Sequence, residues 1–204
     1  TYNEVFGETL NPYDVSKTCG GSSGGAAVSL ATGMVPLADG SDLGGSLRNP
    51  ASFCNVVGFR PSPGRIPTWP HRVSWFPLAV EGPMARCVQD VALLLSVISG
   101  PDPRVSASIA EPGDQFLRSL DREFSGTRVA WSPTLDGLPV DSRVLDVIQQ
   151  QLSVFDDLGC AVEEATPDLN DADEVFRVLR AWYFNLSLGD LLDDHRHQMK
   201  DTVV

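Results

Sequence analysis

Two segments rich in glycine and serine constrain the fold of this chain more than any other feature. The first reads Gly-Gly-Ser-Ser-Gly-Gly over residues 20–25, and the second reads Asp-Leu-Gly-Gly-Ser-Leu-Arg-Asn-Pro over residues 42–50. Glycine admits backbone conformations with φ > 0 and lets another chain or a ligand approach closely. A serine between glycines exposes its hydroxyl, and consecutive N–H groups in such a turn can converge on an anion. Residues 43–46 therefore have the parts for a nucleophile and an oxyanion hole.

Other sites built from the same residue types fit this sequence poorly. The first segment has no Gly-Lys-Ser/Thr ending, so it is not a Walker loop, and the pattern GxGxxG is absent. A Ser-His-Asp triad has no well-placed base, because His71 lies in a proline-rich loop and His195 and His197 lie in a charged terminal segment. We expect all three histidines at the surface.

The composition excludes several functional classes. The 204 residues carry 15 basic and 27 acidic side chains, for a formal net charge of −12. Binding of nucleic acid needs a basic surface, so we expect no nucleic-acid partner. No apolar run reaches the roughly 18 residues of a membrane span, and the first residues lack the features of a signal peptide. The cysteines form no CxxC pair, which argues against a zinc site and for the reducing cytoplasm; they are Cys19, Cys54, Cys87 and Cys160.

Helical periodicity and turn residues predict helices and strands in alternation. Asn49 is expected to cap a short helix whose first residue is Pro50. Strands separated by helices predict an α/β architecture. The other expected helices are 26–32, 84–99, 141–158 and 171–185, and the expected strands are 35–38, 128–131 and one that starts at 161–162.

The loop over residues 100–114 is the one candidate for a boundary within the chain. It is rich in proline and glycine, so it either separates a core portion from an excursion or runs over the surface of one domain. A chain of this length has room for about one domain. We therefore expect a single domain.

The two segments and their surroundings resemble the amidase signature family. The similarity runs in order through residues 20–51 and extends to residues 11–14, 53–61 and 81–86. It covers residues 1–100 well and residues 101–204 more loosely. The resemblance implies a mixed β-sheet core covered by helices on both faces, of which this chain, 1–204, is an incomplete part of a single amidase domain. We expect both ends to be cut.

The resemblance implies that amides are hydrolysed by a Ser–cis-Ser–Lys mechanism. Ser46 is then the nucleophile, and Ser22, preceded by a cis peptide bond, passes the proton between a lysine, Ser46 and the leaving amine. A serine hydroxyl needs such a base, and an amide nitrogen must be protonated before it leaves. The backbone N–H groups implied for the oxyanion hole are those of Leu43, Gly44 and Gly45. The residues implied to brace the loops are Ser23, Asp42 and Arg48.

The lysine of this mechanism has no counterpart in the chain. The two lysines are Lys17 and Lys200. The family's lysine lies N-terminal to the first serine segment, at a position before Thr1, and neither residue matches it. We expect the lysine to be lost by truncation, so the chain alone should be nearly inactive.

The resemblance covers several activities. We expect a stand-alone amide hydrolase that releases ammonia or a simple amine and uses neither a metal nor an organic cofactor; family habit alone suggests a homodimer. The alternatives are the glutaminase subunit of a tRNA-dependent amidotransferase, a non-catalytic scaffold member of the fold, and an esterase. Residues 64–78 lack the Tyr-Gly and Ala-Ser-Ser-Leu-Asp-Gln stretch typical of the glutaminase subunit. Five aromatic residues either line an acyl pocket or, as is more common, belong to the core; they are Trp69, Trp75, Phe76, Trp182 and Tyr183.

Overall fold

The computed structural model describes residues 2–199, apart from the side chain of Asp193. The chain divides into two compact units, Thr1–Arg118 and Ser119–Val204. The first unit contains β1 (Tyr2–Asn3), β2 (Gly7–Glu8), α1 (Gly24–Ala31), β3 (Leu37–Asp42), α2 (Arg48–Phe53), β4 (Val57–Gly58), β5 (Val80–Ala85), α3 (Val88–Ile98) and the 3₁₀ helix η1 (Gly113–Leu117). The second unit contains β6 (Arg128–Trp131), α4 (Ser142–Gln150), α5 (Ser153–Asp157), β7 (Ala161–Glu164), α6 (Ala172–His195) and the 3₁₀ helix η2 (Arg196–Gln198).

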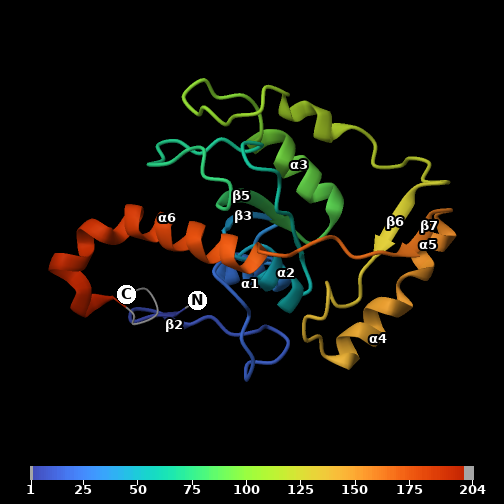
Figure 1. Cartoon of the computed structure of the whole chain (residues 1–204), viewed down its shortest axis with the longest axis horizontal. Helices are drawn as coiled ribbons and strands as arrows, with labels where there is room; N and C mark the ends of the chain where they lie inside the picture. The colour runs from blue at the N-terminus through green and yellow to red at the C-terminus, as the bar shows by residue number, and fades with distance from the viewer. Residues whose placement is uncertain (1, 200–204) are drawn as a thin grey trace. The chain divides into compact units, whose positions relative to one another are not determined.

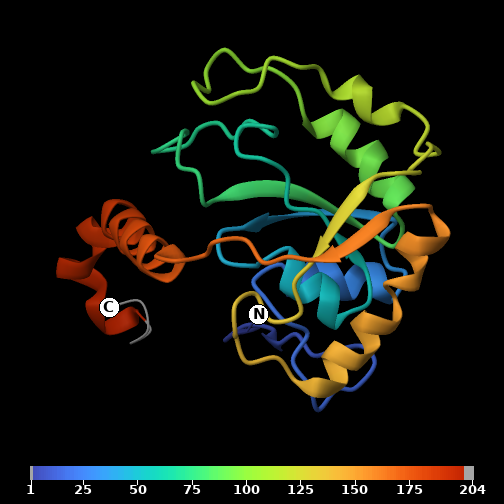
Figure 2. The ribbon, with the colours of Figure 1, turned by 45° about the vertical axis from the view of Figure 1, so that its right-hand side comes forward.

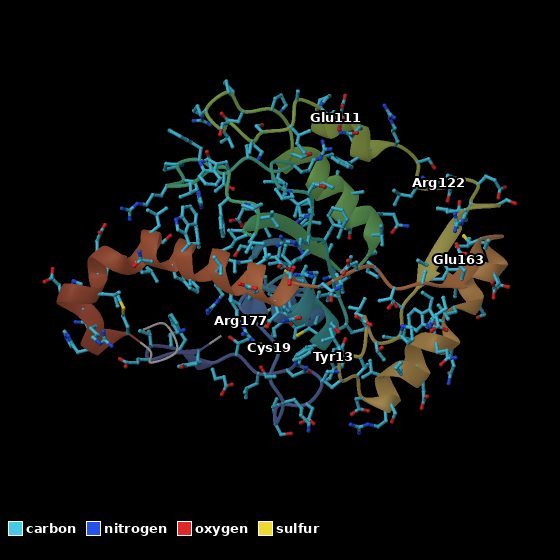
Figure 3. All side chains as sticks on the ribbon, viewed as in Figure 1. Tyr13, Cys19, Glu111, Arg122, Glu163 and Arg177 are labelled. Atoms are coloured by element: carbon cyan, nitrogen blue, oxygen red, sulfur yellow. The ribbon has the colours of Figure 1, made fainter. Side chains whose placement is uncertain are left out.

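A three-stranded antiparallel sheet of order β3-β5-β4 forms the centre of the first unit. Helix α3 covers one face of this sheet, and α1 and α2 cover the other (Figure 1), as a view turned by 45° also shows (Figure 2). The buried apolar residues gather between the sheet, α1 and α2. This core cluster consists of Cys19, Ala27, Leu30, Leu47, Ala51, Cys54 and Met84, with Cys19 labelled in Figure 3.

The sequence did not predict the central strand β5. The helix expected over residues 84–99 is therefore longer than the helix α3 that the structure contains. Met84 and Ala85 belong to β5, and α3 begins only at Val88, after Cys87 in extended conformation. A Gly-Pro pair in mid-strand obscures the pattern, because glycine weakens a strand and proline lacks the N–H for a ladder bond. Pro83 nevertheless lies opposite Asp39 of β3, and its carbonyl accepts from the N–H of Phe59 at 3.0 Å.

Helix α2 begins two residues earlier than the sequence predicts, and its cap differs. Leu47 precedes its first residue, so Asn49 lies inside the first turn and is not the N-cap. The reason is that Asp42, upstream in the chain, accepts the N–H groups of Leu47 and Arg48. A carboxylate from the end of β3 thus satisfies helix N–H groups that a capping side chain would otherwise take.

The second unit is a parallel pair of strands joined through helices. β6 pairs with β7 in parallel, so a crossover is required, and α4 and α5 supply it. Asp141 caps α4 as predicted, by accepting the N–H of Arg143 at 2.9 Å. Arg128 of β6 also donates to Glu163 of β7, which Figure 3 labels. The single helix expected over 141–158 is interrupted at 151–152, where i→i−3 bonds of the 3₁₀ type replace the α pattern.

The predicted α/β class is confirmed, with antiparallel strands in the first unit and a parallel pair in the second. Most expected elements are present with shifted ends: the helix expected over 26–32 is α1, and the helix expected over 171–185 continues as α6 to His195. Within residues 2–199, no helix combines the length and the apolar character needed to cross a bilayer.

Replacing Leu30 by alanine should destabilise the protein by about 2–5 kcal/mol, because Leu30 is fully buried in the core cluster and truncation leaves a cavity. Met34 follows α1 and is 75% exposed, so Met34→Ala should change the free energy of unfolding by less than about 0.5 kcal/mol. Urea unfolding of both variants, made in the protein expressed from its complete reading frame, measures the difference. Equal effects would contradict this assignment of the core.

Candidate active site

The two glycine- and serine-rich segments meet in the first unit, at the junction of α1 and α2. The N–H of Ser23 donates to the carbonyl of Ser46 at 3.2 Å. Gly20 has a φ of 75°, and a Cβ there would lie 3.0 Å from the Cα of Pro50. Because Gly20 has no side chain, residues 20–23 can run directly beside the start of α2. Two segments separated in the sequence therefore form one site.

Ser22 and Ser23 come at the start of α1. The peptide bond between Gly21 and Ser22 is cis, as expected. The Ser23 carbonyl accepts from the N–H of Ala27 at 3.1 Å, and its hydroxyl contacts the carbonyl of Ser41 at 3.4 Å. Ser22 is exposed and Ser46 is half-buried. Among residues 2–199, the hydroxyls of Ser22 and Ser46 bond neither to each other nor to another residue.

The carboxylate of Asp42 organises the loop that carries Ser46. Asp42 is the last residue of β3 and is fully buried. It accepts the N–H of Gly45 at 2.8 Å and the N–H of Leu47 at 3.2 Å, and the N–H of Arg48 lies 3.4 Å away. The residues on both sides of Ser46 are therefore bonded to the same carboxylate, which fixes the backbone from which the Ser46 hydroxyl projects.

Two arginines balance the charge of this carboxylate. The Nε of Arg48 lies 2.9 Å from Oδ2 and its Nη2 lies 3.0 Å from Oδ1, a bidentate pair. Arg60 contributes its Nη1 at 3.1 Å from Oδ1. Burial by itself would raise the pKa of Asp42, but the hydrogen bonds from Arg48, Gly45 and Leu47 and the charge of Arg48 hold that pKa well below its usual value. Asp42 is thus ionised at neutral pH.

The same loop presents backbone donors. Of the N–H groups over residues 43–46, that of Gly45 is bonded to Asp42. The N–H groups of Leu43, Gly44 and Ser46 have no acceptor within the part of the chain that the structure describes. Gly45 has a φ of 109°, which side-chain-bearing residues rarely adopt. Donors that no internal acceptor occupies can bind an oxyanion beside the Ser46 hydroxyl.

Glycines in the sheet make room for this arrangement. A Cβ at Gly40 of β3 would lie 2.4 Å from the Oγ of Ser23, and a Cβ at Gly82 of β5 would lie 2.2 Å from the carbonyl oxygen of Phe59 and 2.5 Å from Leu47. Gly40 and Gly82 are paired across β3 and β5. The absence of side chains on this pair lets Ser23, Leu47 and the segment after β4 lie directly on the sheet.

A small cavity of about 50 Å³ lies in the first unit, between the loop 63–79 and β5. Trp75 and Phe76, two of the five aromatics considered for an acyl pocket, line it together with His71 and Glu81. His71 was expected at the surface but is half-buried in this wall. Burial raises the pKa of Glu81, the charge of Asp39 raises it further, and His71 acts in the opposite direction.

The remaining candidates are not among the residues that line this cavity. Trp69 is about half exposed and stacks under Arg104, while Trp182 and Tyr183 belong to α6 of the second unit. Lys17 is exposed, and Lys200 lies outside the described residues. Within residues 2–199, no three His, Cys, Asp or Glu side chains are grouped to hold a metal ion.

The sequence reasoning did not assign a role to Arg60, Gly40 or Gly82. Arg60 stands in the Phe-Arg-Pro triplet of residues 59–61, and Gly82 stands in a Gly-Pro pair; both lie in stretches already noted for their similarity. The signal was therefore present, but a role needed the pairing of β3 with β5, which the sequence did not reveal.

Comparisons with known proteins agree with this geometry. A family model described as Amidase matches residues 1–197. The chain is 40% identical over 174 residues to an acylamidase of Rhodococcus erythropolis, which covers 85% of this chain and 36% of that protein. It is also 40% identical over 166 residues to a glutamyl-tRNA(Gln) amidotransferase subunit of Lactiplantibacillus plantarum, with 81% of this chain and 34% of the relative covered. The solved structure of a bacterial aryl acylamidase of the amidase signature family matches with a TM-score of 0.88 and 33% identity, over 100% of this chain and 44% of that one. The chain thus spans about a third of the length of the curated relatives it matches.

Acid should destabilise the protein through Asp42. A carboxyl whose pKa is lower in the folded state contributes stability above its unfolded pKa of about 3.9, and this stability is lost as the pH falls towards the folded pKa. Asp42→Asn should lower the free energy of unfolding at pH 7 by about 3–5 kcal/mol, because two arginines lose their buried anion. It should also flatten the dependence on pH between about 5 and 2. Urea unfolding over this range is the measurement, with the exposed Asp146→Asn as control; an unchanged slope in Asp42→Asn would contradict the assignment.

Gly82→Ala should destabilise the protein by about 1–3 kcal/mol or more, because the added methyl meets the carbonyl of Phe59. Gly25 lies within α1, where a Cβ meets nothing within 4 Å, so Gly25→Ala should stabilise by about 0.5–1 kcal/mol. The urea midpoints of the two variants should move in opposite directions. A Gly82→Ala midpoint equal to or above that of the parent would show that the close approach at Gly82 is absent.

Proposed function

Because the chain belongs to the amidase family, we propose that the protein hydrolyses carboxylic amides through an acyl-enzyme on Ser46. The observation that carries this proposal is the position of Ser46. Its neighbours Gly45 and Leu47 are bonded to the buried Asp42, and Ser23 of the other serine segment donates to its carbonyl. A nucleophile fixed in this way, beside N–H groups that have no internal acceptor, suits acyl transfer.

The proposed chemistry uses the two serines and the backbone N–H groups of the loop. The Ser46 Oγ attacks the amide carbonyl carbon, and its proton passes through the Ser22 hydroxyl to the amine nitrogen as the C–N bond breaks. The N–H groups of Leu43 and Gly44 stabilise the negative oxygen of the tetrahedral intermediate, and loss of one such donor typically costs about 3–4 kcal/mol. Water then cleaves the ester on Ser46 and releases the acid. The resemblance to the family implies a lysine as the base that starts the transfer, and neither Lys17 nor Lys200 matches its position.

The remaining predicted site residues act through the loop. Asp42 and Arg48 hold its backbone, and Gly45 combines a positive φ with the hydrogen bond to Asp42. Ser23 joins the two serine segments through its N–H. We assign these four residues to positioning of Ser46.

An N-acylated arylamine is the substrate class that we propose. It follows from the similarity to an acylamidase and to an aryl acylamidase. The alternative is a glutaminase role, supported by an equal identity of 40% to an amidotransferase component. The loop over residues 64–78 favours the first, since its sequence lacks the stretch typical of the glutaminase subunit. All four cysteines are free, which suits a reducing compartment such as the cytoplasm.

Ser46→Ala should reduce hydrolysis of p-nitroacetanilide by about 10³-fold or more, because the nucleophile is removed. Ser22→Ala should also cause a large loss, and the exposed Ser16→Ala should leave the rate unchanged. Release of p-nitroaniline is followed in the protein expressed from its complete reading frame. Retained turnover in Ser46→Ala would overturn the proposed mechanism.

The same preparation distinguishes the two substrate classes. Release of ammonia from glutamine at a rate well above that from the anilide would replace the arylamide assignment with the glutaminase alternative. Absence of both activities in the intact protein would favour the non-catalytic scaffold.

A further inference from the structure

We propose that Arg60 is a positioning residue that holds the loop of Ser46 in its reactive geometry by tying the end of β3 to the start of β5. This inference rests on the proposed function. The Nη1 of Arg60 donates to the backbone carbonyl of Asp42 and lies 3.1 Å from its Oδ1. The Nη2 donates to the carbonyl of Leu78 at 2.9 Å, two residues before β5.

Arg60 reaches these groups across the central strand. It follows β4, and β4 and β3 lie on opposite sides of β5 in the sheet. The segment after β4 is bonded to β5, because the N–H of Phe59 donates to the carbonyl of Pro83 at 3.0 Å, and the bare Gly82 admits the carbonyl of Phe59. One side chain thus connects the last residue of β3 with the segment that follows β4 and the segment that precedes β5, at the edge where the Ser46 loop leaves β3.

The two arginines on Asp42 are not equivalent. The Arg48 side chain is 56% exposed, whereas that of Arg60 is 22% exposed. Arg48 binds the carboxylate through two nitrogens, but water screens an exposed ion pair and reduces its contribution. Arg60 binds the carboxylate through one nitrogen from a less exposed position. Arg60 alone of the two also bonds the backbone carbonyl of Asp42, the residue from which the loop starts.

The geometry needs a guanidinium rather than any cation. Two nitrogens of the planar fork serve Asp42 and Leu78 at the same time. A lysine keeps the charge but has one nitrogen on a flexible stem, so it cannot hold both groups in a fixed relation. Arg60→Lys therefore keeps the positive charge and removes the planar guanidinium, so it tests the two contributions separately.

A positioning role predicts a specific kinetic signature. A displacement of about 1 Å at a reacting group can cost about 10²-fold in rate. Arg60→Lys should lower kcat by about 10–100-fold with little change in KM, and it should slow the labelling of Ser46 by a fluorophosphonate in proportion. Arg60→Gln, which also loses the charge, should be at least as slow. A purely structural role would instead lower the folded fraction and leave the rate per folded molecule unchanged.

The experiment uses the protein expressed from its complete reading frame, with urea unfolding to give the folded fraction of each variant. Arg143→Lys is the matched control, because Arg143 pairs with Asp141 on the second unit and should keep the parent rates. Labelling and turnover of Arg60→Lys at the parent rate per folded molecule would overturn the role of Arg60 while leaving the proposed function intact. A parent protein that is not labelled at Ser46 would overturn both.

Discussion

The buried carboxylate of Asp42 is the group on which the candidate site depends. It accepts backbone N–H groups from both neighbours of Ser46, and it is balanced by Arg48 and Arg60. Charge buried in a protein is costly unless it is paired and fully hydrogen-bonded, and here the partners are the loop itself and two guanidinium groups. The same interactions therefore keep Asp42 ionised and keep the serine loop in one conformation. A substitution at Asp42 therefore changes both the conformation of the serine loop and the charge balance with Arg48 and Arg60.

The sheet accommodates this loop because its paired glycines leave the surface flat. Gly40 and Gly82 face Ser23, Leu47 and the carbonyl of Phe59 at distances that a Cβ would not allow. Asp42 and Leu47 are fully buried at the base of the loop, while Ser22 is exposed and Ser46 half-buried. A nucleophile needs such a rigid support beneath it and access from above.

The sequence predicted local features better than it predicted the sheet. The serine segments, the α/β class and the capping role of Asp141 all follow from local signals, because glycine, proline and capping residues act within a few positions. Strand β5 was missed because Gly82 and Pro83 contradict its local preference, and only its two neighbouring strands explain how they are tolerated. Asn49 was predicted to cap α2, but the carboxylate of Asp42, seven residues earlier in the chain, accepts the N–H group at the start of that helix. The proposed role of Arg60 depends on the same strand pairing. The sequence therefore indicated that Arg60 belongs to a motif, but it could not predict the contacts with Asp42 and Leu78.

The most direct test of the central claim is the site of covalent modification. The protein expressed from its complete reading frame is treated with a fluorophosphonate, its intact mass is measured, and the labelled peptide is mapped. The account predicts a single adduct, on Ser46. A protease that does not cut within residues 42–48 leaves Ser46 on the same peptide as Asp42 and Arg48. An adduct on another serine, or no adduct on a protein that hydrolyses amides, would contradict the assignment of Ser46 as the nucleophile.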